Sequence, residues 1–474
     1  MRLLPGNAPC SRPRPVFSAL VATLVTGTLT LAAASPASAA TATATAGKYW
    51  LAPLDLGPAP ANVQKGLVPR VGLTNSGRGT VAWNQAGDGS ILSRDFTAGG
   101  TVGPLTSPTK GSLVADVARD TAGNVIVTGQ SAGSPAISWT ATRPKDGGNW
   151  LFRTTGSGPY VNAPAAFGLK SGFLVAATSS FTPTTAAAGL PTAAAFGFTT
   201  APGQPVAIGK ALEGVETGDF AHGADGSNWA LGGDGYAVST GRRETTKAKD
   251  GKAAKSVPAL LRLGKTPTRY SILGADRFGA GAVDTVGSAI AVAGLDVQQT
   301  APIAQRGIPV VALGEGDRIE ETVEIGGVPD RRALDVDVAG RAGGGAVVTW
   351  IQQSTARAEN LFGQAKWALV DDAGDVEERG AFTTSKDSHS LRVVRTGSTA
   401  FAVWIQGTGT KARWKAAQID DEGASLVKAP AGNPVGRIEG GLNTSQLTSN
   451  GTQVALTFVD ATTNMVRVAA QRVK

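Results

Sequence analysis

The sequence predicts an all-β fold assembled from repeated four-stranded units. Short β-branched runs bounded by Gly, Asp, Asn, Pro and Ser recur from Trp50 to the end of the chain, and no stretch sustains the 3.6-residue period of an amphipathic helix. Similar strand sequences return at intervals of 44 to 65 residues, after similar turns. Most units carry a second turn rich in Gly and Asp, which predicts a second hairpin in each of them.

The repeat is clearest around "VADVARDTAGNVIVTG" (114–129), where one strand leads through a turn into the next. The segment "GDFAHGADGSNWALGG" (218–233) aligns with it without a gap, and "DVAGRAGGGAVVTW" (337–350) aligns as well. The alignment places an acid at one position of four units, namely Asp116, Asp219, Asp284 and Asp337. The same position in the other four units is filled by Gly72, Ala165, Arg392 and Gln446.

Each unit therefore reads as strand, turn, strand, connection, strand, turn, strand, which is the blade of a β-propeller. The last unit ends after three strands, whereas the segment "KYWLAPLDLG" (48–57) has no partner of its own. We expect this N-terminal strand to complete the last blade and close the ring, so that no sheet edge stays open. The prediction is a single β-propeller over 48–474 with eight blades. Seven blades and one irregular unit are the alternative.

The repeated "A-V-V-T-W" and "A-V-W" strands and the Asp/Asn-x-x-Gly turns resemble those of secreted bacterial β-propellers, over essentially all of the chain after residue 47. A bias toward Ala, Gly, Thr and Val resembles actinobacterial secreted proteins. This resemblance implies the repeat architecture and no particular activity. The S-x-D-x-G-x-T-W box of sialidase-like propellers and the D-x-D-G-D-G calcium loops of integrin-like propellers are missing from the sequence, so no catalytic residue is transferred.

The N-terminus has the features of an export signal. Arg2, Arg12 and Arg14 precede an apolar run over 16–34, and Ala37-Ser38-Ala39 has the small-x-small pattern of a cleavage site. We expect a signal peptide over 1–39, a disordered segment over 40–47, and a secreted or cell-wall-associated protein. A retained membrane helix is the alternative. The single cysteine, Cys10, lies in the leader, so a mature chain would depend on its packed core rather than on disulfides.

Composition argues against several kinds of chemistry. The formal net charge of +8 becomes +5 once the three arginines of the leader are removed, which suits an anionic polymer as a partner. The two histidines, His222 and His389, are too few and too far apart to predict a zinc site, and no cofactor is expected. Two groups of acids, Glu320-Glu321 with Glu324 and Glu377-Glu378, fall in predicted outer strands, where a solvated edge is expected.

The four aligned acids are the candidate axial site. Because Asp116, Asp219, Asp284 and Asp337 share one position of the innermost strand, their carboxylates are expected at one height near the central axis. They could bind a cation or a polyhydroxylated ligand there. They could instead accept backbone N–H groups and fasten each blade to its neighbour. The sequence leaves both interpretations open.

Long connections between the second and third strands are the candidate binding surface. Four consecutive units carry them, over 180–192, 239–256, 297–307 and 352–363. In a meander blade these connections emerge on one face, here named the lip face, where we expect a raised lip. The connection 239–256 carries six basic residues against two acids, and the basic ones are Arg242, Arg243, Lys247, Lys249, Lys252 and Lys255. They predict contact with an anionic polymer, and the alternative is a mobile solvated loop.

Three functions follow from these observations. The first is a monomeric, secreted, non-enzymatic propeller that binds a cell-envelope or extracellular polymer, or another secreted protein, through the lip face. The second is a propeller hydrolase or lyase acting on glycans, with Asp219 and Asp337 as catalytic candidates. The third is a purely structural surface protein. Nucleic acid is not expected as a partner, because aromatic residues are sparse in the basic connection.

Overall fold

The structure is a computed structural model in which the chain forms two compact units, 1–40 and 41–474, and every described residue belongs to the second unit. The described residues are 50–59, 68–85, 89–110, 112–131, 136–158, 164–179, 194–202, 207–208, 212–213, 215–216, 229–231, 237–246, 255–263, 269–272, 278–296, 308–315, 318–326, 331–354, 362–436 and 445–472. The predicted signal peptide (1–39) and the segment 40–47 lie outside them.

The described residues form eight antiparallel sheets. Blade 1 consists of β2 (Arg70–Leu73), β3 (Arg78–Asn84), β4 (Ile91–Thr97) and β5 (Thr106–Thr109), and blade 2 of β6 (Ser112–Arg119), β7 (Val125–Ser131), β8 (Ala136–Arg143) and β9 (Leu151–Gly158). Blade 3 consists of β10 (Ala165–Gly168), β11 (Phe173–Ser179), β12 (Ala194–Thr200), β13 (Ala207–Ile208) and β14 (Leu212–Glu213). Blade 4 consists of β15 (Val215–Glu216), β16 (Trp229–Leu231), β17 (Ala237–Thr246), β18 (Lys255–Leu263) and β19 (Arg269–Ile272).

Blades 5 to 8 follow the same plan. Blade 5 consists of β20 (Phe278–Val286), β21 (Ala289–Asp296), β22 (Ile308–Glu315) and β23 (Arg318–Glu324), and blade 6 of β24 (Arg331–Gly340), β25 (Ala346–Ser354), β26 (Gln364–Val370) and β27 (Val376–Ala381). Blade 7 consists of β28 (Ser388–Thr396), β29 (Thr399–Gln406), β30 (Arg413–Asp420) and β31 (Gly423–Val427). Blade 8 consists of β32 (Ser445–Ser449), β33 (Gln453–Asp460) and β34 (Met465–Arg472) together with β1 (Leu54–Pro58).

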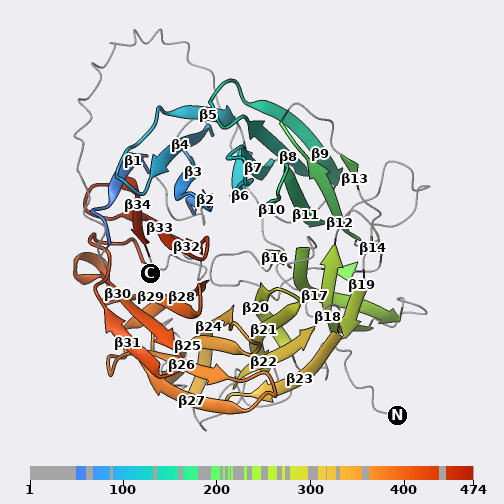
Figure 1. Ribbon diagram of the computed structural model, residues 1–474, viewed down its shortest axis with the longest axis vertical. Coiled ribbons are helices and arrows are strands. Elements are labelled where there is room, and N and C mark those ends of the chain that lie inside the picture. Colours follow the sequence, from blue (N-terminus) through green and yellow to red (C-terminus); the bar gives the residue numbers. More distant parts are fainter. Residues whose placement is uncertain are drawn as a thin grey trace, which may run out of the picture. The chain divides into compact units, whose positions relative to one another are not determined.

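Blade 8 joins the two ends of the unit. Strand β1 pairs antiparallel with β34, Leu54 opposite Val468 and Pro58 opposite Met465, so the sheet runs β1-β34-β33-β32. Figure 1 shows the sheets following one another around a central opening, with β1 beside β34. The fold is an eight-bladed β-propeller closed by its N-terminal strand. The predicted fold class and the predicted closure are confirmed.

The hydrophobic core lies between the blades. Each hydrophobic cluster of buried residues draws its members from two consecutive sheets, because an antiparallel sheet with two apolar faces must be covered on both sides. The cluster between blades 8 and 1, for example, combines Leu56 and Val466 with Val71 and Trp83. Within the described residues, such clusters join every pair of neighbouring blades except blades 3 and 4.

The repeated tryptophans belong to this core. Trp83, Trp350 and Trp404 occupy second strands and are 1%, 4% and 1% exposed. The indole nitrogen of Trp83 in blade 1 donates to the carbonyl oxygen of Pro58 in blade 8 at 3.2 Å. A Cβ atom on Gly57 would lie 2.8 Å from the Trp83 ring, so the chain of β1 passes directly over the indole. All three tryptophans therefore pack between neighbouring blades.

Blade 4 departs from the aligned repeat. The sequence alignment placed 229–231 in the second strand of this unit, but β16 lies at the inner edge of β17, with Leu231 opposite Ala237. This is the pairing of Arg119 with Val125 in blade 2, so "WAL" is the innermost strand and the alignment of unit 4 was wrong. The physical reason is the sequence "GGDG" at 232–235, whose glycines favour the hairpin turn.

No helix among the described residues is long or apolar enough to span a membrane. In the same part of the chain, the helical structure is the short 3₁₀ turn η4 (Gly409–Lys411) between β29 and β30.

The closure gives a testable prediction. We expect Leu56→Ala to lower the free energy of unfolding by about 2–5 kcal/mol, because the side chain is 0% exposed between blades 8 and 1. Urea unfolding measures the change. The matched control is Leu426→Ala, whose side chain is 67% exposed and whose loss should stay within about 0.5 kcal/mol. Equal stability of the two variants would contradict the docking of β1.

Candidate functional site

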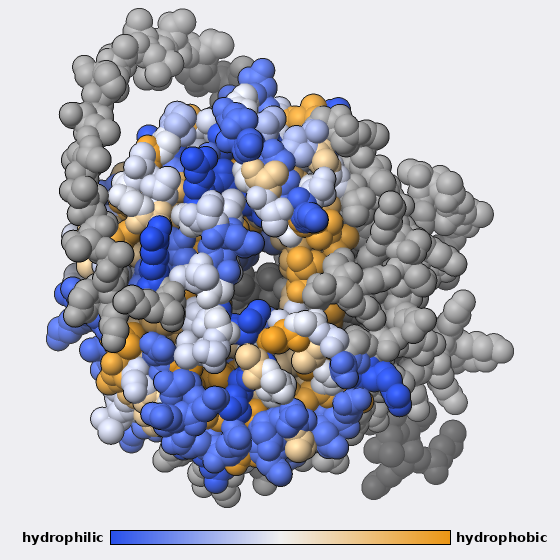
Figure 2. Space-filling model, in the orientation of Figure 1, coloured by the Kyte–Doolittle hydropathy of each residue, from blue (hydrophilic) through white to orange (hydrophobic). Residues whose placement is uncertain are grey.

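The innermost strands enclose a central channel. Residues of β2, β6, β10, β16, β20, β24, β28 and β32, together with adjoining turns, line a cavity of about 500 Å³. The space-filling view shows the opening at the centre of one face (Figure 2). Each innermost strand pairs with a neighbour on one side only, so the backbone groups on its other edge face this channel.

Two of the predicted axial acids occupy this edge in the same way. In blade 2, Asp116 accepts the N–H of Val117 at 2.8 Å through one oxygen and the N–H of Ala166, in blade 3, at 2.9 Å through the other. In blade 6, Asp337 accepts the N–H of Val338 at 3.0 Å and the N–H of Val393, in blade 7, at 2.9 Å. Each carboxylate therefore bridges the inner edges of two adjacent blades.

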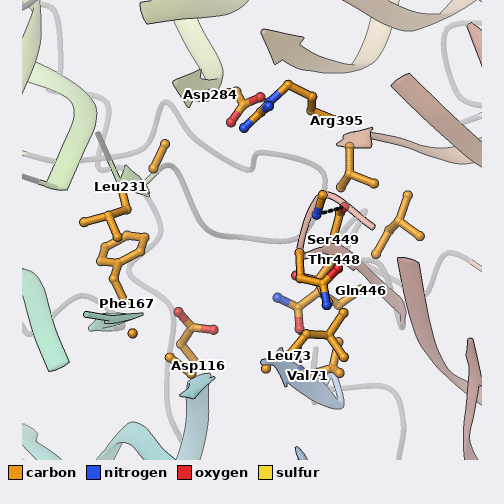
Figure 3. Close-up of a pocket in the computed structure, with 18 of the residues that line it drawn as sticks. Val71, Leu73, Asp116, Phe167, Leu231, Asp284, Arg395, Gln446, Thr448 and Ser449 are labelled. Atoms are coloured by element: carbon orange, nitrogen blue, oxygen red, sulfur yellow. Dashed lines mark hydrogen bonds between the residues drawn. The ribbon is translucent and has the colours of Figure 1, made fainter. Parts of the chain in front are cut away.

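Asp284 in blade 5 forms a variant of this bridge. Its carboxylate accepts the N–H of Gly340, in blade 6, at 2.8 Å, and also the backbone N–H of Thr285. Burial raises the pKa of Asp284, and the two backbone N–H groups and the positive charge of Arg395 offset only part of this effect. Figure 3 shows Asp284 and Arg395 pointing toward each other across the channel wall.

These contacts bear on the second interpretation of the acids. An inner strand edge leaves N–H groups that must find acceptors. Asp116, Asp284 and Asp337 accept such N–H groups from the adjacent blade, as that interpretation expects, and ligand binding by them stays a prediction. Asp219 lies outside the described residues. Within the described ranges, no cluster of three or more His, Cys, Asp or Glu residues could hold a metal ion.

In the units that lack the aspartate, the residue at the same position has its own contacts with the neighbouring structure. Gln446 in blade 8 performs the same task as the acids, since its side-chain oxygen accepts the N–H of Val71, in blade 1, at 2.8 Å. At Gly72 a Cβ atom would lie 2.8 Å from the carbonyl oxygen of Val117, so blade 2 leaves no room for a side chain there. Arg392 is 2% exposed and donates to the carbonyl oxygen of Leu391.

Sequence reasoning missed part of this network. Asp335 accepts the N–H of Ser390 at 3.0 Å, which adds a second bridge between blades 6 and 7. Asp335 stands two residues before Asp337 in the sequence, but the alignment of the repeats drew attention to Asp337 alone. Gln446 was aligned correctly, but its amide was not identified as a substitute for the carboxylate.

Both walls of the channel carry polar and apolar side chains. Phe167 and Leu231 lie on one wall with Asp116 nearby, and Gln446, Thr448 and Ser449 lie on the opposite one beside Val71 and Leu73 (Figure 3). The carboxylates that bridge the blades already accept backbone N–H groups.

The predicted basic connection is shorter than expected. Arg242 and Arg243 belong to strand β17, opposite Pro258 and Val257 of β18, and Lys255 begins β18. Placing these three in a loop was wrong, because the misaligned hairpin shifted the second strand of the unit. Lys247, Lys249 and Lys252 lie in 247–254, outside the described residues. The connections over 180–192 and 297–307 and most of 352–363 are also outside them.

The two histidines and the two acidic groups are the remaining candidate residues of the sequence. His389 lies on β28, is 1% exposed, and contacts the Phe362 ring at a centroid distance of 4.9 Å. His222 lies outside the described residues. The two acidic groups occupy the outermost strands of different blades, β23 and β27, as predicted, so they form no common site.

Solved structures that resemble this chain are β-propellers as well. No protein-family profile matches the sequence, and no curated protein is similar to it. Solved structures that resemble the chain include Chaetomium thermophilum Sqt1 bound to the N-terminus of ribosomal protein L10, with 11% identity, a TM-score of 0.49 and coverage of 90% of this chain and 99% of that one.

Two further resemblances are as distant. Virginiamycin B lyase from Staphylococcus aureus has 10% identity and a TM-score of 0.40, with coverage of 89% and 99%. The β-propeller domain of the Trilobed protease from Pyrococcus furiosus has 8% identity and a TM-score of 0.41, with coverage of 76% and 98%. The chain is structurally similar to β-propellers of several kinds, and at these identities the likeness concerns the fold and no activity.

The bridging role predicts a loss of stability rather than of chemistry. We expect Asp337→Ala to lower the free energy of unfolding by about 2–3 kcal/mol, because two inner-edge N–H groups lose their acceptor. Urea unfolding measures it, with Asp146→Ala, in an exposed turn, as the control. An unchanged stability would overturn the bridging role.

The raised pKa of Asp284 predicts a pH dependence. The folded protein holds this proton at pH values where the unfolded chain has lost it, so ionisation of Asp284 reduces stability as the pH rises from about 3.9 through the raised pKa. Asp284→Asn removes this loss. The stability of the variant relative to the wild type should therefore rise across that window and stay constant above it.

Unfolding curves at a series of pH values measure this difference, with Asp146→Asn as the control for a change in surface charge. A relative stability of Asp284→Asn that stays constant or falls as the pH rises would contradict the expected direction.

Proposed function

We propose that the protein is exported and acts as a non-enzymatic, monomeric β-propeller that binds an anionic polymer of the cell envelope or the extracellular space through its lip face. The observation that carries the proposal is the use of Asp116, Asp284 and Asp337 as backbone acceptors between blades. A glycan hydrolase or lyase working at the axis would need an acid free to exchange a proton with its substrate.

The lip face is the surface that supports binding best. Antiparallel meander order brings the connection between second and third strands of every blade to the same end. Loops on a rigid scaffold are where binding residues commonly gather. Between β17 and β18 the sequence holds Lys247, Lys249 and Lys252 against Asp250, a local excess of positive charge that favours an anionic ligand.

Sedimentation with insoluble polymers tests the proposal. The chain 40–474 is mixed with peptidoglycan carrying its anionic polymers, with the same material after acid extraction of those polymers, and with neutral cellulose. We expect retention on the first material alone, weakening as salt rises from 50 to 500 mM, because exposed charge pairs are screened. Lys247→Gln/Lys249→Gln/Lys252→Gln should lower retention several-fold.

The control variant is Lys145→Gln/Lys170→Gln, which changes two exposed lysines in turns at the opposite end of the blades. Absence of retention on all three materials overturns the proposal. Release of reducing sugar from a glycan, abolished by Asp219→Asn, would overturn it in favour of the hydrolase.

A further inference from the structure

A basic groove crosses blades 7 and 8 at the end of the blades that forms the lip face. It consists of two adjoining hollows of about 330 and 430 Å³, and Arg413, at the start of β30, lines both. The smaller hollow is bordered by the connection between β29 and β30. The larger one extends to the turn between β33 and β34.

Three cations that meet no acid among the described residues border the smaller hollow. Lys411, Arg413 and Lys415 are all exposed, and none forms an ion pair with a described residue. The strand β30 alternates, so that Arg413 and Lys415 face solvent while Trp414 is buried against Phe458. The one acid lining this hollow is Asp387, whose carboxylate accepts a hydrogen bond from Ser385, so the lining carries an excess of positive charge.

The guanidinium of Arg413 is fixed in place by the backbone. Its Nη1 donates to the carbonyl oxygens of Thr410, at 2.9 Å, and of Ala412, at 2.6 Å. These two contacts leave its positive charge without a carboxylate. A planar guanidinium held in this way can offer its remaining N–H groups to a phosphate or a carboxylate.

The negative charge of Asp460, which lines the larger hollow, is already balanced by Arg467 and by backbone N–H groups. Asp460 is 1% exposed and accepts the backbone N–H groups of Asn433, Thr462 and Thr463, while Arg467 donates to it at 2.7 Å. Burial alone would raise the pKa of Asp460, but these donors outweigh it and hold the pKa below its ordinary value. This carboxylate therefore serves as an acceptor for the loop rather than as a binding group.

The wall between the hollows is braced as well. With its amide turned so that the nitrogen faces two carbonyl oxygens, Asn433 donates to Gly409 at 3.1 Å and to Ala412 at 3.0 Å. The connection after β31 is thereby fastened to the 3₁₀ turn η4, which carries Lys411. The cations are presented on a fixed surface, which reduces the ordering needed on binding.

We propose that this groove binds successive anionic groups of one polymer chain, phosphates or carboxylates. The ligand class rests on the proposed function. A polymer fits better than a small anion, because single exposed ion pairs are worth about 0.2–1 kcal/mol and several must act together.

Fluorescence titration of the chain 40–474 with two soluble probes tests the groove. The probes are polyphosphate and polygalacturonate, which separate phosphate from carboxylate recognition, and dextran is the neutral control. Lys411→Gln/Lys415→Gln keeps the braced Arg413, and Lys411→Gln/Arg413→Gln/Lys415→Gln removes all three cations. Thermal unfolding verifies that both variants fold like the wild type.

We expect the double variant to weaken binding of at least one probe about threefold and the triple variant about tenfold, with a shallower salt dependence, whereas Lys145→Gln/Lys170→Gln stays within twofold. If groove variants bind like this control while Lys247→Gln/Lys249→Gln/Lys252→Gln loses affinity, the groove is wrong and the proposed function stands. If the wild type binds neither probe and is not retained on peptidoglycan, both are overturned.

Discussion

The inner edge of each blade is the constraint on which the rest of the structure depends. Eight sheets radiating from one axis leave eight innermost strands whose channel-side N–H groups have no ladder partner. Asp116 and Asp337 meet this need with one geometry, one oxygen for the next residue and one for the adjacent blade. Because each bridge spans two blades, satisfying the edges also fixes the spacing of the blades around the channel.

This constraint explains why closure matters. Blade 8 can serve blade 1 only when the ring is complete, and Gln446 forms that link to Val71. At the same junction, Thr457 donates to the carbonyl oxygen of Pro69, and nearer the rim Trp83 donates to that of Pro58. The junction between the two ends of the unit is thus held by polar contacts near the axis and by β1 at the rim.

Much of this could be predicted from the sequence, for a physical reason. The β-branched runs and Gly-Asp turns repeat because every blade meets the same packing problem, so the repeated units, their strand order outside blade 4 and the N-terminal closure could all be predicted. Blade 4 was misread because "ADGSN" and "GGDG" are both good turn sequences, and pairing alone decides which one closes the hairpin. The exchange of a carboxylate for the Gln446 amide, and the groove around Arg413, depend on contacts between distant segments that no local pattern records.

The division between interior and surface charges bears on function. Inside the channel, carboxylates meet backbone N–H groups of adjacent blades, and changing them costs stability. At the lip face, Lys411, Arg413 and Lys415 meet no described acid, although Asp460 nearby is saturated with donors. Exposed cations that meet no acid among the described residues repel one another, and an anionic partner would relieve that repulsion. This contrast between interior and surface charges is what supports the proposed binding role of the lip face.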